Sequence, residues 1–174
     1  STSASVGGGG GGRVAVFYNT SSYAGTYHAY GGSKTNSGLD GGAGTIYLKA
    51  SASTNGDLFV ANGNGGSIIR SAIEASTPLP ATPTDFNSIT VTDDARVSTS
   101  TLASVDGAIS VDDSYLYTIG AISVSALSVT LENSAIFQAY TLTIPTVTIS
   151  TGSNLTHQNT DGSSIYKLTV NATT

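Results

Sequence analysis

The second half of the chain repeats one pattern, in which a short strand is followed by a small polar turn and a second short strand. Four segments carry this pattern: Ile89–Val97, Ile109–Leu116, Val129–Ile136 and Thr148–Leu155. Aligning them makes one strand position recur about every 20 residues, at Val91, Val111, Leu131 and Ser150. One turn position recurs in the same way, at Asp94, Asp113, Asn133 and Gly152. A repeat of this length is typical of a solenoid, because one turn cannot bury its apolar residues alone and must stack on the next.

We therefore predict an all-β fold, a parallel β-helix (β-solenoid) with rungs of about 20 residues. Stacked rungs lie about 4.8 Å apart, and the whole chain would form about seven or eight of them. Many short strands separated by turns also fit a β-sandwich, which is the alternative architecture. The constant period and the glycine-rich turns favour the solenoid. A chain of 174 residues is expected to form a single domain, spanning residues 1–174.

Glycine clusters precede two strands that we expect in the first half of the chain. Gly7–Gly12 lead into Arg13–Tyr18, and Gly41–Gly44 lead into Thr45–Lys49. Glycines have no side chain to pack, so they form either a linker or a segment that lies against another backbone. We predict that residues 1–12 form a glycine-rich N-terminal arm of one of these two kinds.

One segment has apolar residues at helical rather than strand spacing. Ser67–Ala75 carries three isoleucines and an alanine in this pattern, and Pro78 would end the helix. Further prolines follow at Pro80 and Pro83. The segment 67–85 is therefore predicted to be a loop or short-helix excursion from the stack.

The charge and cysteine content exclude several classes of function. Only 10% of the residues are charged, the formal net charge is −5, and the sequence pI is about 4.6. The six basic residues are scattered, whereas nucleic-acid binding needs clustered Lys and Arg. The chain has no cysteine, which excludes disulfides, thiol catalysis and zinc–thiolate sites. No apolar run reaches the roughly 18 residues of a membrane span. We expect partners other than nucleic acid and no membrane insertion.

Tyrosines are concentrated in one short region, at Tyr18, Tyr23, Tyr27 and Tyr30. Packing in the core and at sheet edges is one explanation for them. The other is a carbohydrate-binding face, because a tyrosine ring stacks on a sugar while its hydroxyl forms hydrogen bonds. The two histidines, His28 and His157, lie in different regions, and no catalytic Ser/His/Asp arrangement follows from their spacing.

Acidic pairs occupy the turns of two successive repeats, at Asp93, Asp94, Asp112 and Asp113. Stacked rungs would place these carboxylates one above the other, where they can bind calcium through oxygen ligands or form an acid/base pair. A solvated turn that keeps the stack soluble is the simpler explanation. Calcium is the one cofactor that the sequence suggests.

Three asparagines lie in N-x-S/T sequences and are candidate glycosylation sites: Asn19, Asn154 and Asn171. Such matches also arise by chance in a chain rich in Asn, Ser and Thr.

The N-terminal third resembles a segment of large secreted or cell-surface proteins that fold as right-handed parallel β-helices. The residues that carry the resemblance are Gly7–Gly12 with Arg13–Tyr18, Gly41–Leu48, and Gly56–Val60. The resemblance implies an extracellular module of an adhesin-like or surface protein, and it implies no residue-specific activity.

The function expected from these observations is that of a non-enzymatic structural or adhesive module, outside the cell or on its surface. Its partners would be other copies of itself, as in a filament, or neighbouring domains of a larger surface protein. Carbohydrate binding through the tyrosines is one alternative. A polysaccharide-active β-helix enzyme that uses the turn aspartates is the other.

Overall fold

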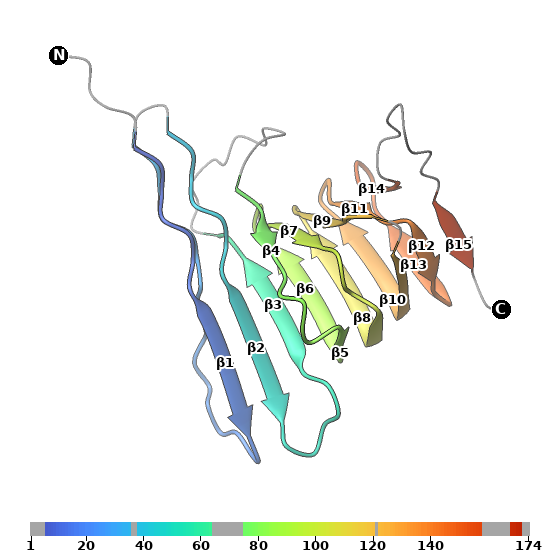
Figure 1. Cartoon of the computed structure of the whole chain (residues 1–174), viewed down its shortest axis with the longest axis horizontal. Helices are drawn as coiled ribbons and strands as arrows, with labels where there is room; N and C mark the ends of the chain where they lie inside the picture. The colour runs from blue at the N-terminus through green and yellow to red at the C-terminus, as the bar shows by residue number, and fades with distance from the viewer. Residues whose placement is uncertain (1–5, 36–37, 64–74, 121, 158–167, 172–174) are drawn as a thin grey trace.

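The computed structural model describes residues 6–35, 38–63, 75–120, 122–157 and 168–171. This part of the chain is all-β and forms a parallel β-solenoid of about four turns (Figure 1). Its strands are β1 (Arg13–Tyr18), β2 (Thr45–Ala50), β3 (Asp57–Ala61), β4 (Thr77–Pro78), β5 (Asp85–Phe86), β6 (Ser88–Thr92), β7 (Arg96–Thr99), β8 (Ser104–Asp112), β9 (Tyr115–Thr118), β10 (Ser123–Glu132), β11 (Ile136–Gln138), β12 (Thr141–Thr143), β13 (Thr146–Ile149), β14 (Asn154–Thr156) and β15 (Thr169–Asn171). The predicted fold class is confirmed, and the β-sandwich is not formed.

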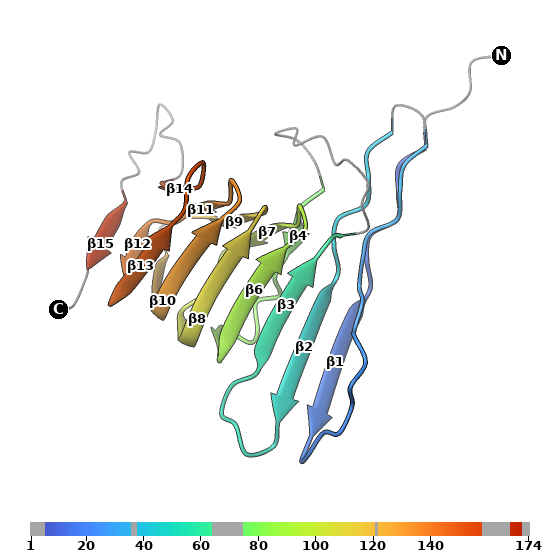
Figure 2. The ribbon, with the colours of Figure 1, turned by 180° about the vertical axis from the view of Figure 1, so that it is seen from behind.

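The strands form a large sheet and a small sheet, which face each other across the core. The large sheet has the order β1-β2-β3-β6-β8-β10-β12-β15, with β5 beside β8 and β13 beside β10. The small sheet has the order β14-β11-β9-β7-β4. In Figure 2, which shows the molecule from behind, the large sheet lies in front and the small sheet lies behind it. Each full turn of the solenoid passes along the large sheet and returns through one strand of the small sheet.

The alternation of apolar and polar residues builds columns of side chains inside the solenoid. Val91, Val111 and Leu131 pair with one another in successive strands, as the repeat predicts, and each is 0% exposed. The next residue in this column is Ile149, because β13 pairs with β10 in a register that joins Leu131 to Ile149. The prediction of Ser150 at this position was wrong by one residue, since the last repeat is shorter than the earlier ones.

The predicted turn residues do lie at the corners of the solenoid. Asp94, Asp113 and Asn133 have φ values of 58°, 47° and 49°, in the left-handed region that Asn and Asp enter more readily than most residues. Backbone hydrogen bonds link neighbouring corners, including one of 3.0 Å from the Asp94 N–H to the Asp113 carbonyl. Gly152, at φ 84°, lies against Ser134.

The N-terminal third departs from a regular solenoid. β2 and β3 form an antiparallel pair, with Ile46 opposite Phe59, because the chain reverses at the turn that contains Gly56. β1 pairs parallel to β2, so these two strands run opposite to the strands of the solenoid. The structure therefore contains about four solenoid turns, fewer than the seven or eight rungs predicted from the sequence.

Three extended segments, 6–12, 29–35 and 38–44, pack as a glycine bundle beside β1 and β2. Their backbone hydrogen bonds run in a cycle: the first segment donates to the third, the third to the second, and the second to the first. The bonds recur at every third residue of each segment, with donor N–H groups at Gly8, Gly11, Gly32, Thr35, Gly38, Gly41 and Gly44. A three-residue period is that of polyproline II packing, in which only glycine fits where chains approach closely.

A Cβ atom at Gly8, Gly41 or Gly44 would lie within 2 Å of a neighbouring carbonyl oxygen, which explains the glycines at these positions. Residues 7–12 of the N-terminal arm thus lie against other backbone segments, which is one of the two arrangements predicted for the arm. Residues 1–5 lie outside the described part of the chain.

The predicted helix at 67–75 falls almost wholly on residues 64–74, which lie outside the described part of the chain. The end of the predicted excursion belongs to the stack, since β4 pairs with β7 and β5 pairs with β8. No described helix is long and apolar enough to cross a membrane.

Candidate functional site

A cleft of about 390 Å³ lies between the tyrosine-rich segment and the outer face of the large sheet. Its floor consists of Ile46 and Leu48 of β2, Phe59 of β3, and Thr90 and Thr92 of β6. These side chains point outward because their neighbours along the strands, such as Val60 and Val91, point into the core. The floor is therefore apolar in its centre and carries hydroxyl groups along β6.

Aromatic residues of the segment 25–30 form the wall of this cleft. Tyr27, His28 and Tyr30 all line it. The His28 and Tyr30 rings lie 4.9 Å apart between centroids, and His28 Nε2 is 2.8 Å from Thr26 Oγ1. Tyr27 and Tyr30 are half-buried, so part of each ring faces solvent. The wall thus presents ring surface next to groups that can form hydrogen bonds.

Of the four predicted tyrosines, Tyr27 and Tyr30 line the cleft. Tyr23 does not line the cleft but stacks on Tyr27, with a ring distance of 4.8 Å, and its hydroxyl donates to the Thr26 carbonyl. Tyr18 lies at the end of β1, where its carbonyl accepts hydrogen bonds from Ser51. Tyr27 and Tyr30 are therefore the predicted tyrosines that could contact a sugar in this cleft, and carbohydrate binding stays a prediction.

Sequence reasoning missed His28, Phe59 and the two threonines as cleft residues. His28 lies between Tyr27 and Tyr30 in the sequence, and this position is the signal that could have identified it. The alternation along β6 indicates that Thr90 and Thr92 share the outward face. Nothing in the sequence indicates that the segment 25–30 folds over that face.

The turn aspartates lie at neighbouring corners of the solenoid, and two of them, Asp93 and Asp112, accept side-chain hydrogen bonds there. Asp112 Oδ1 accepts a hydrogen bond of 2.6 Å from Asn133 Nδ2, and Asp93 accepts one of 3.2 Å from the Thr92 hydroxyl. Within the described residues, no three His, Cys, Asp or Glu side chains gather as a metal site requires. Calcium binding and acid/base chemistry at Asp93, Asp94, Asp112 and Asp113 stay predictions.

The carboxylate of Asp85, in β5, has a pKa that clearly departs from the usual value. Hydrogen bonds from the hydroxyls of Ser104, at 2.6 Å, and Thr84, at 2.9 Å, hold its pKa below the usual value. The bond from Ser104 joins β8 to β5 and so links neighbouring strands of the stack when Asp85 is ionised, whereas the bond from Thr84 is local. A group held ionised in this way does not suit a general acid.

Of the candidate glycosylation sites, Asn19 and Asn154 are exposed. Asn19 accepts a hydrogen bond from the Ser51 hydroxyl, and Asn154 donates one of 3.2 Å to the Gly152 carbonyl. Asn171 lies in β15. Glycosylation at the three positions stays a prediction.

No known protein family, curated protein or solved structure matches this chain.

Proposed function

We propose that the chain is a non-enzymatic structural module that joins end to end with further copies of itself, outside the cell or at its surface. The observation that supports this proposal is the exposure of the solenoid interior at its C-terminal end. Val129 and Leu131 of β10 are 0% exposed, whereas their partners in the next strand, Val147 and Ile149, are 37% and 46% exposed.

The neighbouring strand pair shows the same change in exposure. Leu142 of β12 is 0% exposed, whereas its partner Val170 of β15 is 43% exposed. The column that is buried within the stack thus ends in side chains that a further turn would cover. Covering such side chains is favourable by about 25 cal/mol per Å² of apolar area.

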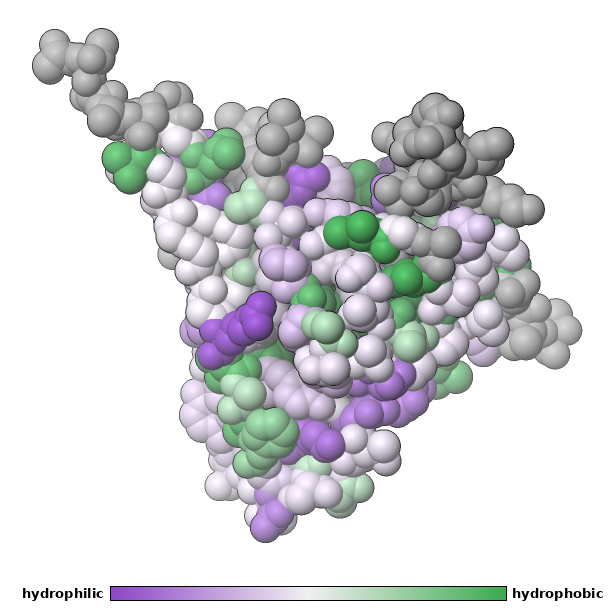
Figure 3. Space-filling view, viewed as in Figure 1, coloured by the Kyte–Doolittle hydropathy of each residue, from purple (hydrophilic) through white to green (hydrophobic). Residues whose placement is uncertain are grey.

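The N-terminal end is also unfinished on its inner face. The small sheet ends at β4, and Phe17 of β1 is 70% exposed beside the ring of Tyr47, at 6.0 Å between centroids. Figure 3 shows hydrophobic atoms over the lower parts of β1 and β2. β1 and β15 are the two edges of the large sheet, and such edges accept additional strands.

A second copy of the chain is the occupant that fits both ends. Joining the C-terminal end of one copy to the N-terminal end of the next covers both apolar surfaces, and repetition of this contact gives an open filament. The low charge, 10% of residues, leaves little repulsion between copies. The resemblance to secreted and cell-surface β-helices supports an extracellular location.

Sedimentation velocity over a range of concentrations tests this proposal. We expect the unmodified chain to form a series of oligomers, and Ile149→Lys or Phe17→Lys to stop at the monomer. An equimolar mixture of the two variants should form dimers only, since each variant keeps one intact end. Leu127→Lys is the control, because Leu127 is 62% exposed at the register shift in β10 and away from both ends. A monomer at every concentration would contradict the proposal.

Carbohydrate binding is a second candidate, supported by the cleft under Tyr27 and Tyr30. An apolar floor, aromatic rings and nearby hydroxyls suit a sugar ring, which has an apolar face and a polar rim. In a glycan array screen, we expect Tyr27→Ala or Tyr30→Ala to weaken binding about tenfold, as the loss of one aromatic contact implies. Tyr18→Ala is the control outside the cleft. Equal binding by all three variants would exclude this site.

A further inference from the structure

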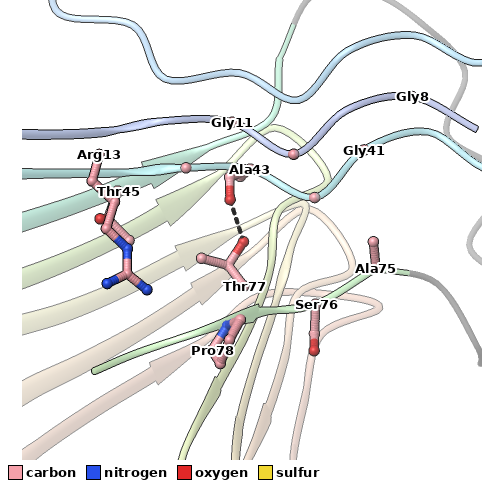
Figure 4. A pocket seen from close by; sticks show the side chains of 13 residues that line it. Gly8, Gly11, Arg13, Gly41, Ala43, Thr45, Ala75, Ser76, Thr77 and Pro78 are labelled. Atoms are coloured by element: carbon pink, nitrogen blue, oxygen red, sulfur yellow. Dashed lines mark hydrogen bonds between the residues drawn. The ribbon is translucent and has the colours of Figure 1, made fainter. Parts of the chain in front are cut away.

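A second cleft, of about 280 Å³, opens beside the glycine bundle and contains a positive charge. Its lining residues include Gly10, Arg13, Gly42, Thr45, Ser76 and Thr77. Figure 4 shows the Arg13 and Thr45 side chains next to each other, with Ser76, Thr77 and Pro78 across the cleft. The Thr77 hydroxyl donates to the Ala43 carbonyl and ties the two walls together.

Among the described residues, no acidic side chain lines the cleft beside the Arg13 charge. Within the described residues, the Arg13 guanidinium takes part in no ion pair, whereas Lys34 lies 3.9 Å from Asp40. Arg13 is an exposed residue of the edge strand β1, so its guanidinium is accessible to a ligand from solvent. It presents a planar set of N–H donors that matches a carboxylate in a two-point contact.

A second polar group of the cleft, the Thr45 hydroxyl, lies beside Arg13 in the paired strand β2. Thr45 is only 7% exposed, and its backbone N–H donates to the Gly12 carbonyl. Its hydroxyl forms no hydrogen bond with the described part of the chain. A buried polar group without a partner is costly, and such groups in native structures commonly bind water or a ligand. Ser76 supplies another hydroxyl across the cleft.

We infer that this cleft binds the carboxylate group of a small acidic ligand, with Arg13 as the cation and Thr45 as a hydrogen-bond donor. The walls of glycine backbone leave room for the body of the ligand, because the cleft is larger than a carboxylate alone. This site is separate from the tyrosine cleft, and none of its lining residues is shared with it. Arg13 lies on β1, the edge strand at the end that the proposed assembly would cover, so binding is best measured on a monomeric chain.

Two-dimensional ¹H–¹⁵N NMR titration of the full chain carrying Ile149→Lys, which should keep it monomeric, tests the inference, with glucuronate as the probe and glucose as its neutral counterpart. Acetate tests the carboxylate alone, and chloride at equal ionic strength controls for general screening. We expect glucuronate and acetate to shift the amide signals of Gly42 and Thr45 in a saturable way, and glucose and chloride to leave them unchanged. Equal shifts from chloride, or none from glucuronate, would overturn the inference.

Two substitutions identify the site of binding. Arg13→Gln should weaken glucuronate binding at least about tenfold, because it removes a charge-assisted hydrogen bond. Gly10→Asp places a competing carboxylate in the cleft at a position where a Cβ meets no atom within 4 Å, and it should weaken binding similarly. Gly9→Asp is the matched control, since Gly9 is equally open but does not line the cleft. Unchanged affinity in Arg13→Gln and Gly10→Asp would overturn the assignment.

Discussion

Polar residues at the corners of the solenoid allow the backbone to adopt a left-handed conformation there. Asp94, Asp113 and Asn133 occupy left-handed backbone positions, where most side chains are strained. The aspartates at these turns were interpreted as candidate metal ligands or as solvated charges. Their φ values provide a simpler reason for Asp and Asn there, because short polar side chains tolerate this conformation.

Substitution of Asn133 tests this role. Asn133→Ala should be less stable than Asn133→Gly by about 1 kcal/mol, because alanine at φ 49° is strained whereas glycine is not. Both variants lose the hydrogen bond to Asp112, so their difference reports on the backbone. The measurement is chemical denaturation in urea. At the adjacent strand residue Glu132 the order should reverse, with alanine more stable than glycine.

At the scale of elements, the glycine bundle and the solenoid turns are held by different contacts. Solenoid turns are joined by columns of buried side chains. The three bundle segments are joined by backbone hydrogen bonds, and at several glycines the neighbouring backbones lie too close for a side chain. The bundle therefore depends on the absence of a side chain at particular glycines. Other glycines in the same segments meet no neighbour and are free of this restriction.

Gly41 and Gly10 distinguish these two kinds of glycine. A Cβ atom at Gly41 would lie 1.9 Å from the Gly9 carbonyl oxygen, whereas one at Gly10 would meet nothing within 4 Å. We expect Gly41→Ala to lower the free energy of unfolding by about 1–3 kcal/mol, as overpacking does, and to increase amide hydrogen exchange in the bundle. Gly10→Ala should match the unmodified chain. Equal effects of the two substitutions would contradict the close packing of the bundle.

At the scale of the whole molecule, stability should be greatest in the middle turns of the stack. Each turn contacts only its neighbours, so an inner turn is supported on two sides and a terminal turn on one. In the core column, the exposed fraction rises from 0% at Leu131, in an inner turn, to 46% at its partner Ile149, in the last turn.

Truncation of these two residues measures the gradient. Leu131→Ala should lower the free energy of unfolding by about 2–5 kcal/mol, because it leaves a cavity in a filled core. Ile149→Ala should cost less than about 1 kcal/mol when the protein is dilute enough to be monomeric, because nearly half of the Ile149 side chain is already in water. Equal losses would indicate that the C-terminal end is covered in solution.

Features that depend on local periodicity could be predicted from the sequence. The 20-residue spacing predicts the parallel stack, and Asp, Asn and Gly mark the corners. These signals are local because each strand and each turn is specified by a few adjacent residues. The one-residue error at Ser150 arose where a shortened repeat broke the constant spacing.

Features that depend on contacts between distant segments could be found in the three-dimensional structure alone. Glycine has no side chain and leaves no alternating pattern, so the cyclic hydrogen bonding of three segments, with pairs such as Gly11 and Gly42, could not be predicted. The antiparallel pairing of β2 and β3 likewise reduced the number of turns. Both clefts form where a loop or extended segment meets a sheet, and the position of such a segment depends on the packing of the whole chain rather than on its own sequence.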